Sequence, residues 1–337
     1  MNEHVVVTGG AGFIGSNLTR ALLARGSRVT VLDDLSEGEA ENLAELEDHA
    51  AYRFVRADVR DEAAVRAACA DADKVVHLAA RKIPRYGNAL ATLDVNATGS
   101  RVVLEAAAEV GAKIAVASTS DVYGKNPDVP FREQSSPSVI GSPKVRRWAY
   151  AVSKMYEEQV AFALHEERGL QVTVLRYFGG YGPFQHKGWL GGPQSVFFEK
   201  AHRGEPLSIH HDAPSAGPSP TWTTWCAAHS WPQTPSAPWA WSMNIKGTRE
   251  FPITSSPSSA GDRARRRAPA RVPTQRLPRR QLRGRAAARP DPSLAREHPG
   301  FSAEVDVEDG LRRTWDWLLE RAGSRERLDA RFSWSRR

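Results

Sequence analysis

The sequence predicts an α/β protein built on a doubly wound parallel sheet, with a smaller C-terminal substrate domain. Three observations support this prediction. Apolar β-branched runs alternate with helical patterns over the first 180 residues, a glycine-rich turn joins the first run to the first helix, and the regular pattern breaks after residue 211. Such an alternation is typical of a parallel sheet with helices on both faces.

The strands are expected where short apolar runs occur, and the helices where apolar residues recur every three or four positions. Strands are predicted at residues 4–8, 27–33, 52–55, 74–78, 113–117 and 171–177, and helices at 13–25, 61–69, 95–110 and 148–168. Glycines that follow two of these helices, Gly26 and Gly169, predict their ends. Further along, residues 243–254 predict a strand and turn, and residues 307–320 an amphipathic helix.

The chain divides into two expected domains and a tail. Its 337 residues are enough to bury a full core. We expect the dinucleotide-binding domain over residues 1–180, the substrate domain over residues 181–321, and a polar tail over residues 322–337. Residues 255–289 are rich in serine and proline and then in arginine, which is a composition typical of disordered segments.

Charge and composition favour a cytoplasmic protein that binds neither nucleic acid nor membrane. The net charge is +7, but residues 263–289 hold eleven arginines and no acidic residue, so the rest of the chain is acidic. No apolar run is long enough to span a bilayer, and the first residues lead directly into a strand pattern without a signal peptide. Cys69 and Cys226 have neither metal-binding spacing nor a disulfide pattern, so no metal is expected.

The turn after the first strand has the features of a dinucleotide site of the Rossmann type. Gly9, Gly12 and Gly15 follow the spacing G-x-x-G-x-x-G between a strand and a helix. Glycine lets the backbone approach a pyrophosphate, whose charge is favoured at a helix N-terminus. Asp33 ends the second strand, where a carboxylate can accept hydrogen bonds from ribose hydroxyls and repel a 2′-phosphate, so NAD is predicted rather than NADP. The alternative is a tight turn without ligand.

Two further strand ends supply candidate cofactor contacts. Asp58 and Val59 follow the third strand and are placed to face an adenine. The segment Leu78–Ala80 ends the fourth strand with small residues that leave room for the cofactor. His77 lies just before it, and we interpret this histidine as structural rather than catalytic.

The candidate reacting groups come from a helix and from a strand end. Tyr150 and Lys154 are four residues apart, which places them on one face of a helix. A nearby ammonium and a nicotinamide cation would favour the phenolate, and would make Tyr150 a general base. A hydroxyl at the end of the fifth strand could relay a proton to it, and Ser118, Thr119 and Ser120 are all candidates.

Taken together, the motifs strongly resemble the extended short-chain dehydrogenase/reductase family, the NAD-dependent nucleotide-sugar epimerases and dehydratases. They read TGGAGFIG, VLDDLS, ADVRD, HLAA, DVNATG, STSDVYG, YAVSK and RYFGGYGP. The resemblance covers residues 4 to about 211, and then 243–254 and 291–320.

That resemblance implies a triad of Thr119, Tyr150 and Lys154, with Tyr150 taking a proton from the sugar C4 hydroxyl while hydride passes from C4 to NAD. It also implies that Lys82 and Asn96 face the cofactor. The full set of expected cofactor-binding residues is Gly9, Gly12, Phe13, Ile14, Gly15, Asp33, Asp58, Val59, Leu78, Ala79, Ala80, Lys82, Asn96, Ser118, Tyr150, Lys154 and Tyr177.

Within the family, the sequence favours a UDP-glucuronate decarboxylase over a UDP-hexose 4-epimerase. Family decarboxylases commonly carry glutamate just before V-Y-G, and Asp121 here is one methylene shorter. The Ser120-Asp121 pair disfavours a 4,6-dehydratase, although Asp121 as a plain solvated or capping carboxylate stays open. Gly179 stands where the family usually has asparagine, which leaves the subclass open. A homodimer through a helix pair that includes residues 148–168 is also implied.

The second half departs from the family in a way that suggests shifted reading frames. Residues 213–228, APSAGPSPTWTTWCAA, become GTQRRTFTYVDDLVRG if one base is restored after the Asp212 codon and the free codon positions are chosen to fit. Tryptophan has the single codon TGG and threonine codons begin with AC, so the bases of Trp222-Thr223 contain GAC in the shifted frame. GAC encodes aspartate. Residues 213–242 and 255–289 are therefore interpreted as out of frame or disordered, and no site residue is placed in 213–242. As written, the chain could alternatively be an NAD-binding protein with an impaired sugar pocket.

Resequencing the DNA around the Asp212 codon tests this interpretation. We expect a missing base that restores the family-like segment. Confirmation of the written codons, in a protein that is catalytically active, would contradict a frame error.

Overall fold

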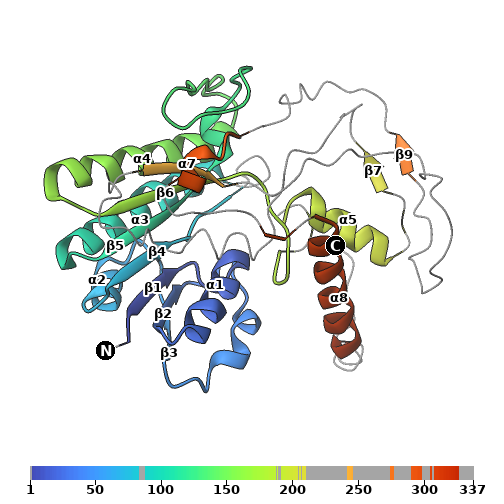
Figure 1. Ribbon diagram of the computed structural model, residues 1–337, viewed down its shortest axis with the longest axis horizontal. Helices are drawn as coiled ribbons and strands as arrows, with labels where there is room; N and C mark the ends of the chain where they lie inside the picture. Colours follow the sequence, from blue (N-terminus) through green and yellow to red (C-terminus); the bar gives the residue numbers. More distant parts are fainter. Residues whose placement is uncertain are drawn as a thin grey trace.

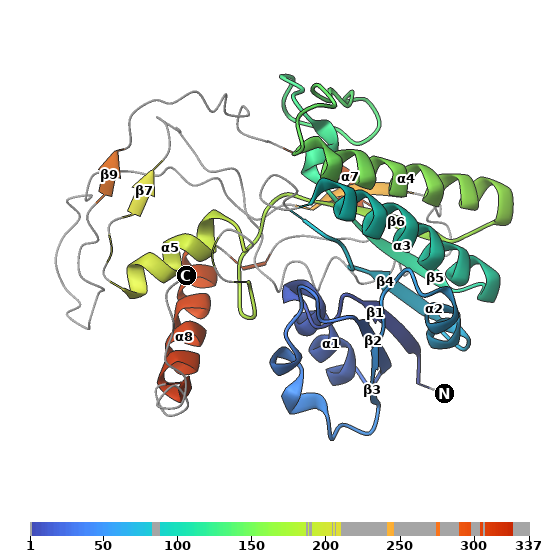
Figure 2. The same cartoon turned by 180° about the vertical axis from the view of Figure 1, so that it is seen from behind.

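The computed structural model describes a parallel sheet domain and parts of a second region. The described residues are 2–82, 88–186, 188, 191–203, 205, 207–209, 241–245, 274–276, 290–297, 304–305 and 307–325. Figures 1 and 2 show the sheet domain on one side and α5 and α8 on the other.

The sheet domain alternates strands with helices, as the sequence predicts. Its strands are β1 (His4–Thr8), β2 (Arg28–Asp33), β3 (Tyr52–Arg56), β4 (Lys74–His77), β5 (Lys113–Thr119), β6 (Val172–Tyr177) and β8 (Trp241–Ile245). Its helices are α1 (Phe13–Ala24), α2 (Glu62–Cys69), α3 (Ala89–Val110), α4 (Trp148–Arg168) and α7 (Ser293–Glu297), with short 3₁₀ turns η1 (Ala40–Asn42), η2 (Ala44–Leu46) and η3 (Ser120–Tyr123).

Strand order and register decide where the site lies. The order is β3-β2-β1-β4-β5-β6-β8, and every pairing is parallel. The order reverses between β1 and β4, where Thr8 pairs with His77. Because parallel strands point the same way, the turns after β1, β2, β4 and β5 all meet at one edge, and the reversal leaves a crevice there.

Two apolar layers cover the sheet, because successive strand residues point to opposite faces. Val5 and Val7 pack with α1 and α7 on one face, whereas Val6 packs with α2, α3 and α4 on the other. This arrangement, visible in Figure 1, confirms the doubly wound fold that the sequence predicts.

The main error in the predicted elements concerns the start of α3. We expected this helix from residue 95, but it begins at Ala89. The Asn88 side chain caps it by accepting hydrogen bonds from the backbone N–H groups of Leu90 and Ala91. The first turn exposes Leu90, so it lacks the apolar pattern by which the helix was located.

The second region contributes α5 (Pro193–His202), α8 (Val307–Arg325) and a two-stranded sheet of β7 (Leu207–Ile209) and β9 (Thr274–Arg276). Trp315 of α8 packs against Phe198 of α5, with ring centroids 6.4 Å apart. Strand β9 lies within the segment 255–289 that was predicted to be out of frame or disordered, so three of its residues form a strand. The other residues of that segment, and residues 213–240, lie outside the described residues.

Candidate active site

A close approach of two turns forms the floor of the site. Gly9 follows β1 with φ +69°, and a Cβ there would lie 2.6 Å from the backbone nitrogen of Ala79, after β4. Only glycine allows both the left-handed conformation and this distance. The turn after β1 therefore lies directly beside the turn after β4.

The N-terminus of α1 is open to an anion. Gly12 is the N-cap residue, no side chain caps the helix, and its first turn has no acidic residue. A Cβ on Gly15 would lie 2.4 Å from the carbonyl oxygen of Gly9, so this glycine keeps the turn packed on the helix. The exposed N–H groups and the helix dipole together suit a pyrophosphate.

Asp33 is fixed in orientation at the end of β2. Its Oδ2 accepts a hydrogen bond from the Ala11 N–H at 2.9 Å, and its Oδ1 accepts one from the Leu35 N–H at 2.8 Å. Burial raises the pKa of Asp33, and the two backbone donors oppose this effect. The oriented carboxylate retains lone pairs that can accept hydrogen bonds from ribose hydroxyls, which favours NAD over its 2′-phosphorylated form.

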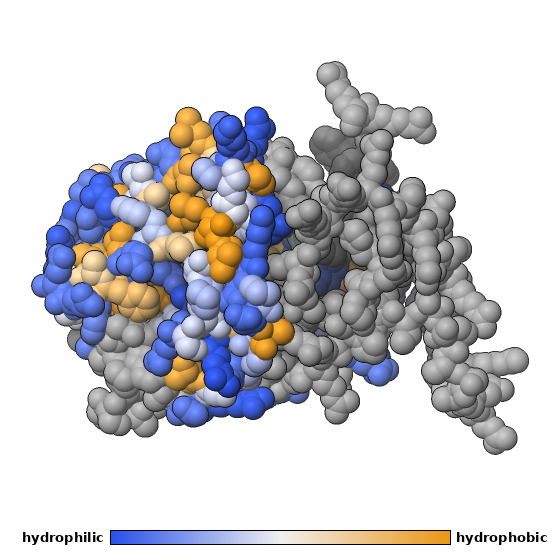
Figure 3. Space-filling view, turned by 90° about the horizontal axis from the view of Figure 1, so that it is seen from above, coloured by the Kyte–Doolittle hydropathy of each residue, from blue (hydrophilic) through white to orange (hydrophobic). Residues whose placement is uncertain are grey.

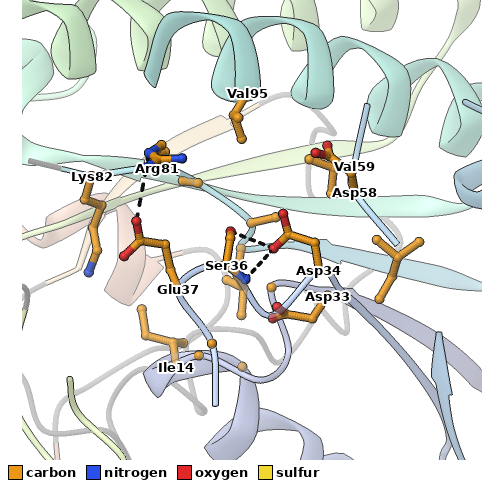
Figure 4. A pocket seen from close by; sticks show the side chains of 18 of the residues that line it. Ile14, Asp33, Asp34, Ser36, Glu37, Asp58, Val59, Arg81, Lys82 and Val95 are labelled. Atoms are coloured by element: carbon orange, nitrogen blue, oxygen red, sulfur yellow. Dashed lines mark hydrogen bonds and ion pairs between the residues drawn. The ribbon is translucent and has the colours of Figure 1, made fainter. Parts of the chain in front are cut away.

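A pocket at this edge contains most of the predicted cofactor contacts (Figure 4). Those that line it are Gly9, Gly12, Phe13, Ile14, Gly15, Asp33, Asp58, Val59, Leu78, Ala79, Ala80 and Lys82. Ten further residues line the pocket and were not predicted from the sequence, namely Leu32, Asp34, Ser36, Glu37, Gly38, Ala57, Arg60, Arg81, Val95 and His186. Residues 34–38 could have been found as the continuation of the loop after Asp33, whereas nothing in the sequence marked His186.

Asp58 does not face the pocket as a free carboxylate. Arg60 pairs with it at 2.6 Å and also pairs with Asp94 of α3. Hydrogen bonding from Arg60 holds the pKa of Asp58 below its usual range. The pair places a guanidinium and an ionised carboxylate together at the end of the pocket that the sequence assigns to the adenine.

Five predicted cofactor contacts lie outside the pocket lining, namely Asn96, Ser118, Tyr150, Lys154 and Tyr177. The Asn96 side chain accepts a hydrogen bond from the Arg81 N–H at 2.7 Å and donates one to Ser153 Oγ at 3.0 Å. The Ser118 hydroxyl donates to Glu158 on α4. Tyr177 is buried at the end of β6. Their roles toward a cofactor remain predictions.

The three predicted reacting groups do come together. Thr119 ends β5, and its side chain hydrogen-bonds with Tyr150 on α4. Lys154 lies one turn further along α4 and is 1 % exposed. Of the three hydroxyls left open at the end of β5, the one on Thr119 contacts Tyr150, whereas the one on Ser118 donates to Glu158.

The electrostatics of Tyr150 differ from the expectation. We expected a nearby ammonium to lower its pKa, but the structure raises it, first through burial and then through the negative charges of Asp121 and Glu157. The hydrogen bond with Thr119 opposes this increase only in part. Burial is the first reason for the difference, and the second is that Lys154 lies beside the negative charge of Glu157, with which it is paired at 2.6 Å.

His77 makes contacts inside the protein, which agrees with the prediction that it has a structural role rather than a catalytic one. It is fully buried, with Nδ1 2.7 Å from Thr8 Oγ1 and Nε2 2.9 Å from Ser100 Oγ. Burial and the nearby charge of Lys154 lower its pKa to about 3, so the ring is neutral near pH 7.

Two residues bear on the subclass. Asp121 lies 3.8 Å from Arg147, and its negative charge is one of those that raise the pKa of Tyr150. Its role in the reaction stays a prediction. Gly179 has φ +56°, a conformation that glycine and asparagine both adopt. The backbone there suits the residue usual in the family, but the side-chain amide is missing.

The fold and the pocket define a dinucleotide-binding α/β protein, in which Thr119, Tyr150 and Lys154 lie close together at the ends of β5 and α4. The comparisons agree: a model of the NAD dependent epimerase/dehydratase family matches residues 5–215, and the chain belongs to this family. The glycine-rich turn, the open helix N-terminus and Asp33 fit its NAD cofactor.

Curated relatives include enzymes of several activities. A UDP-N-acetyl-alpha-D-glucosaminuronate decarboxylase from Bacillus cytotoxicus is 33% identical over 63% of this chain and 65% of its own length. A dTDP-glucose 4,6-dehydratase from Streptomyces niveus is 39% identical over 54% of this chain and 55% of its own. UDP-glucuronic acid decarboxylase 1 from Arabidopsis thaliana is 35% identical over 62% of this chain and 47% of its own. The chain thus matches less than two thirds of each of these relatives.

Solved structures share the fold. A UDP-glucose 4-epimerase from Thermotoga maritima, with UDP-glucose, has a TM-score of 0.79 and 26% identity, over 95% of this chain and 99% of that one. A dTDP-glucose 4,6-dehydratase from Streptomyces venezuelae, with NAD bound, has a TM-score of 0.77 and 26% identity, over 96% of this chain and 99% of that one.

The described residues contain no cluster of histidine, cysteine or acidic residues that could hold a metal ion. Among the helices that the structure describes, none is both long and apolar enough to cross a membrane.

Replacing Gly15 with alanine should abolish NAD binding, because the added methyl group collides with the Gly9 carbonyl at the pyrophosphate turn. We expect the Kd for NAD, measured by titration calorimetry, to rise by at least about a hundredfold. This corresponds to a loss of about 2.8 kcal/mol of binding free energy.

The matched control is Gly26→Ala, at the other end of α1. Gly26 has φ +85° with open space around its Cα. This variant should lose about 1 kcal/mol of folding free energy through backbone strain, with NAD affinity unchanged. A Gly15→Ala protein that binds NAD like the wild type would contradict the assigned turn.

Proposed function

We propose that the protein is an NAD-dependent nucleotide-sugar enzyme that works through a 4-keto intermediate, with UDP-glucuronate decarboxylation as the lead reaction. The observation that carries the proposal is the contact of Thr119 with Tyr150, one helical turn from Lys154, at the same sheet edge as the NAD pocket. The decarboxylases among the relatives support the lead, and the epimerase and dehydratase matches support the broader class.

The residues divide the work in the proposed reaction. Bound NAD supplies the hydride acceptor. Tyr150 removes the proton from the sugar C4 hydroxyl, and Thr119 holds that hydroxyl and the phenol in line. Lys154 supplies positive charge beside Tyr150 and has N–H donors for the nicotinamide ribose. In a decarboxylase the C4 ketone then acts as the electron sink while the C6 carboxylate leaves as carbon dioxide. C5 takes up a proton, and C4 regains the hydride, with the Tyr150 proton returning to its oxygen, which gives the UDP-pentose. An epimerase keeps the carbon skeleton and returns hydride to the other face of C4.

The second candidate, a UDP-hexose 4-epimerase, is favoured by the structural match that carries UDP-glucose. A third, non-catalytic candidate follows from the sequence. The family model ends at residue 215, close to the segment proposed to be out of frame, and this supports a damaged sugar pocket in the chain as written.

One assay separates these candidates. The protein, with NAD, is incubated with UDP-glucuronate and with UDP-glucose, and the products are separated by chromatography. We expect a UDP-pentose from UDP-glucuronate, and a Tyr150→Phe variant should lower kcat by about 10²- to 10⁴-fold because the general base is gone. UDP-galactose from UDP-glucose would instead establish the epimerase, and NAD binding without any product would favour the impaired protein.

We also propose a cytoplasmic homodimer that pairs through α4. Val152 and Tyr156 lie four residues apart on this helix and are 44% and 42% exposed. Figure 3 views the molecule from above Figure 1, the side on which α4 lies, and hydrophobic residues there are interspersed with hydrophilic ones. An apolar stripe on one helix is suited to packing against its copy.

Val152→Arg tests the proposed dimer. A charge at the centre of the stripe should convert a dimer to a monomer in sedimentation velocity, whereas Glu166→Arg, at an exposed position near the end of the same helix, should leave it dimeric. A wild-type protein that sediments as a monomer would refute the pairing.

A further inference from the structure

A glutamate lies buried beside the reacting groups without a role in the reaction above. Glu157 is 0% exposed, and its Oε2 lies 2.6 Å from Nζ of Lys154. Its other oxygen, Oε1, has no hydrogen-bond partner among the described residues. A buried carboxylate is costly unless it is fully paired, so this half-satisfied group requires a physical explanation.

The surroundings of Glu157 contain few charges. On α4 itself lie Lys154, Tyr150 and Glu158, and the last is bound by Arg176 of β6 at 2.6 Å and by Ser118 of β5. From α3 comes Ser100, and from β4 the neutral His77, which faces Lys154. Lys154 is therefore the cation paired with Glu157, and no other described charge is paired with Lys154.

The pair has two consequences for the site. It occupies one of the three N–H donors of Lys154, which leaves two for other acceptors. It also compensates the ammonium charge, so that the negative charge of Glu157 acts on Tyr150 and disfavours the phenolate. Glu157 thus works against the effect for which a lysine next to a catalytic tyrosine is expected.

We propose that Glu157 is a positioning residue that holds Lys154 in a buried ion pair when ionised and, when protonated, leaves the Lys154 charge free to promote ionisation of Tyr150. The inference rests on the proposed function, because it takes Lys154 and Tyr150 as the reacting pair. It adds a titratable carboxyl that controls how strongly the charge of Lys154 acts on Tyr150. Thr119, Tyr150 and Lys154 alone contain no such group.

The two states of Glu157 are accessible near neutral pH. Burial raises the pKa of its carboxyl to about 7, against the opposing effects of Lys154 and of the Ser100 hydroxyl. Above that value the carboxyl is ionised and paired. Below it the carboxyl is neutral and the ammonium is uncompensated, which lowers the pKa of Tyr150. The titrations of the three groups are coupled, so the measured midpoints belong to the cluster.

Glu157→Gln in the full chain with NAD bound is the direct test. Glutamine has nearly the same shape and keeps an oxygen for Lys154, but it is permanently neutral. NMR of protein labelled at the tyrosine ring carbon that bears the hydroxyl reports ionisation, and a Tyr150→Phe protein identifies the Tyr150 signal. We expect Tyr150 to ionise about one pH unit lower in E157Q than in the wild type, because a nearby negative charge has been removed.

Glu166→Gln is the matched control, since it removes the same charge from an exposed position on the same helix. It should leave the Tyr150 midpoint unchanged. An unchanged midpoint in E157Q, or an equal shift in E166Q, would overturn the proposal.

Ser100→Ala keeps the proposal testable if E157Q fails to fold. It retains the ion pair but removes a hydroxyl that lowers the pKa of Glu157. In carboxyl-labelled protein, the Glu157 signal should titrate near pH 7 in the wild type and at a higher pH in S100A. A Glu157 signal that titrates at the ordinary value of a glutamate would overturn the proposal.

These spectra do not depend on turnover. A protein that forms no product from either UDP-sugar but shows both shifts would contradict the proposed function and leave the role of Glu157 standing. A protein that forms product without either shift would support the proposed function and contradict the role of Glu157.

Discussion

The parallel pairing of β1 with β4 is the constraint on which the rest of the site depends. This pairing reverses the strand order and brings the turn after Thr8 beside the turn after His77. Because a Cβ on Gly9 would lie 2.6 Å from Ala79, the approach exists only with glycine at that position. The open N-terminus of α1, the fixed carboxylate of Asp33 and the small residues after β4 all face the crevice that results.

A second layer of buried polar groups supports the reacting side chains. Arg176 binds Glu158, Glu158 accepts a hydrogen bond from Ser118, and Lys154 pairs with Glu157. The contacts of Glu158 join α4, which carries Tyr150, to β6 and to β5, which carries Thr119. Buried charges are tolerated here because each has a partner. Glu157 differs from the others because one of its oxygens has no hydrogen-bond partner among the described residues. Burial raises the pKa of its carboxyl to about 7, so its charge state responds to pH near neutrality.

Much of the fold and the pocket could be predicted because local chemistry specifies them. The strands β1 to β6 and α4 fall where apolar periodicity places them, and twelve predicted contacts line one pocket. The exception is β8, which begins at Trp241, inside the segment 213–242 that was interpreted as out of frame or disordered. The start of α3 could not be predicted, because its first turn exposes Leu90 and depends on capping by Asn88. The spacing of residues in the sequence also did not indicate that Asn96 hydrogen-bonds with Arg81 and Ser153. The same is true of the hydrogen bond between Ser118 and Glu158.

The sequence by itself determined the doubly wound fold, the glycine turn, the acidic residue after β2 and the four-residue spacing of Tyr150 and Lys154. Each of these is encoded within a short stretch of chain, where periodicity and residue type suffice. Only the tertiary structure decided that Arg60 pairs with Asp58 and Asp94, that Thr119 is the hydroxyl in contact with Tyr150, and that Glu157 compensates Lys154. These are matters of distance and burial. A charge acts through the groups that surround it, and most of those groups come from elements far away in the chain.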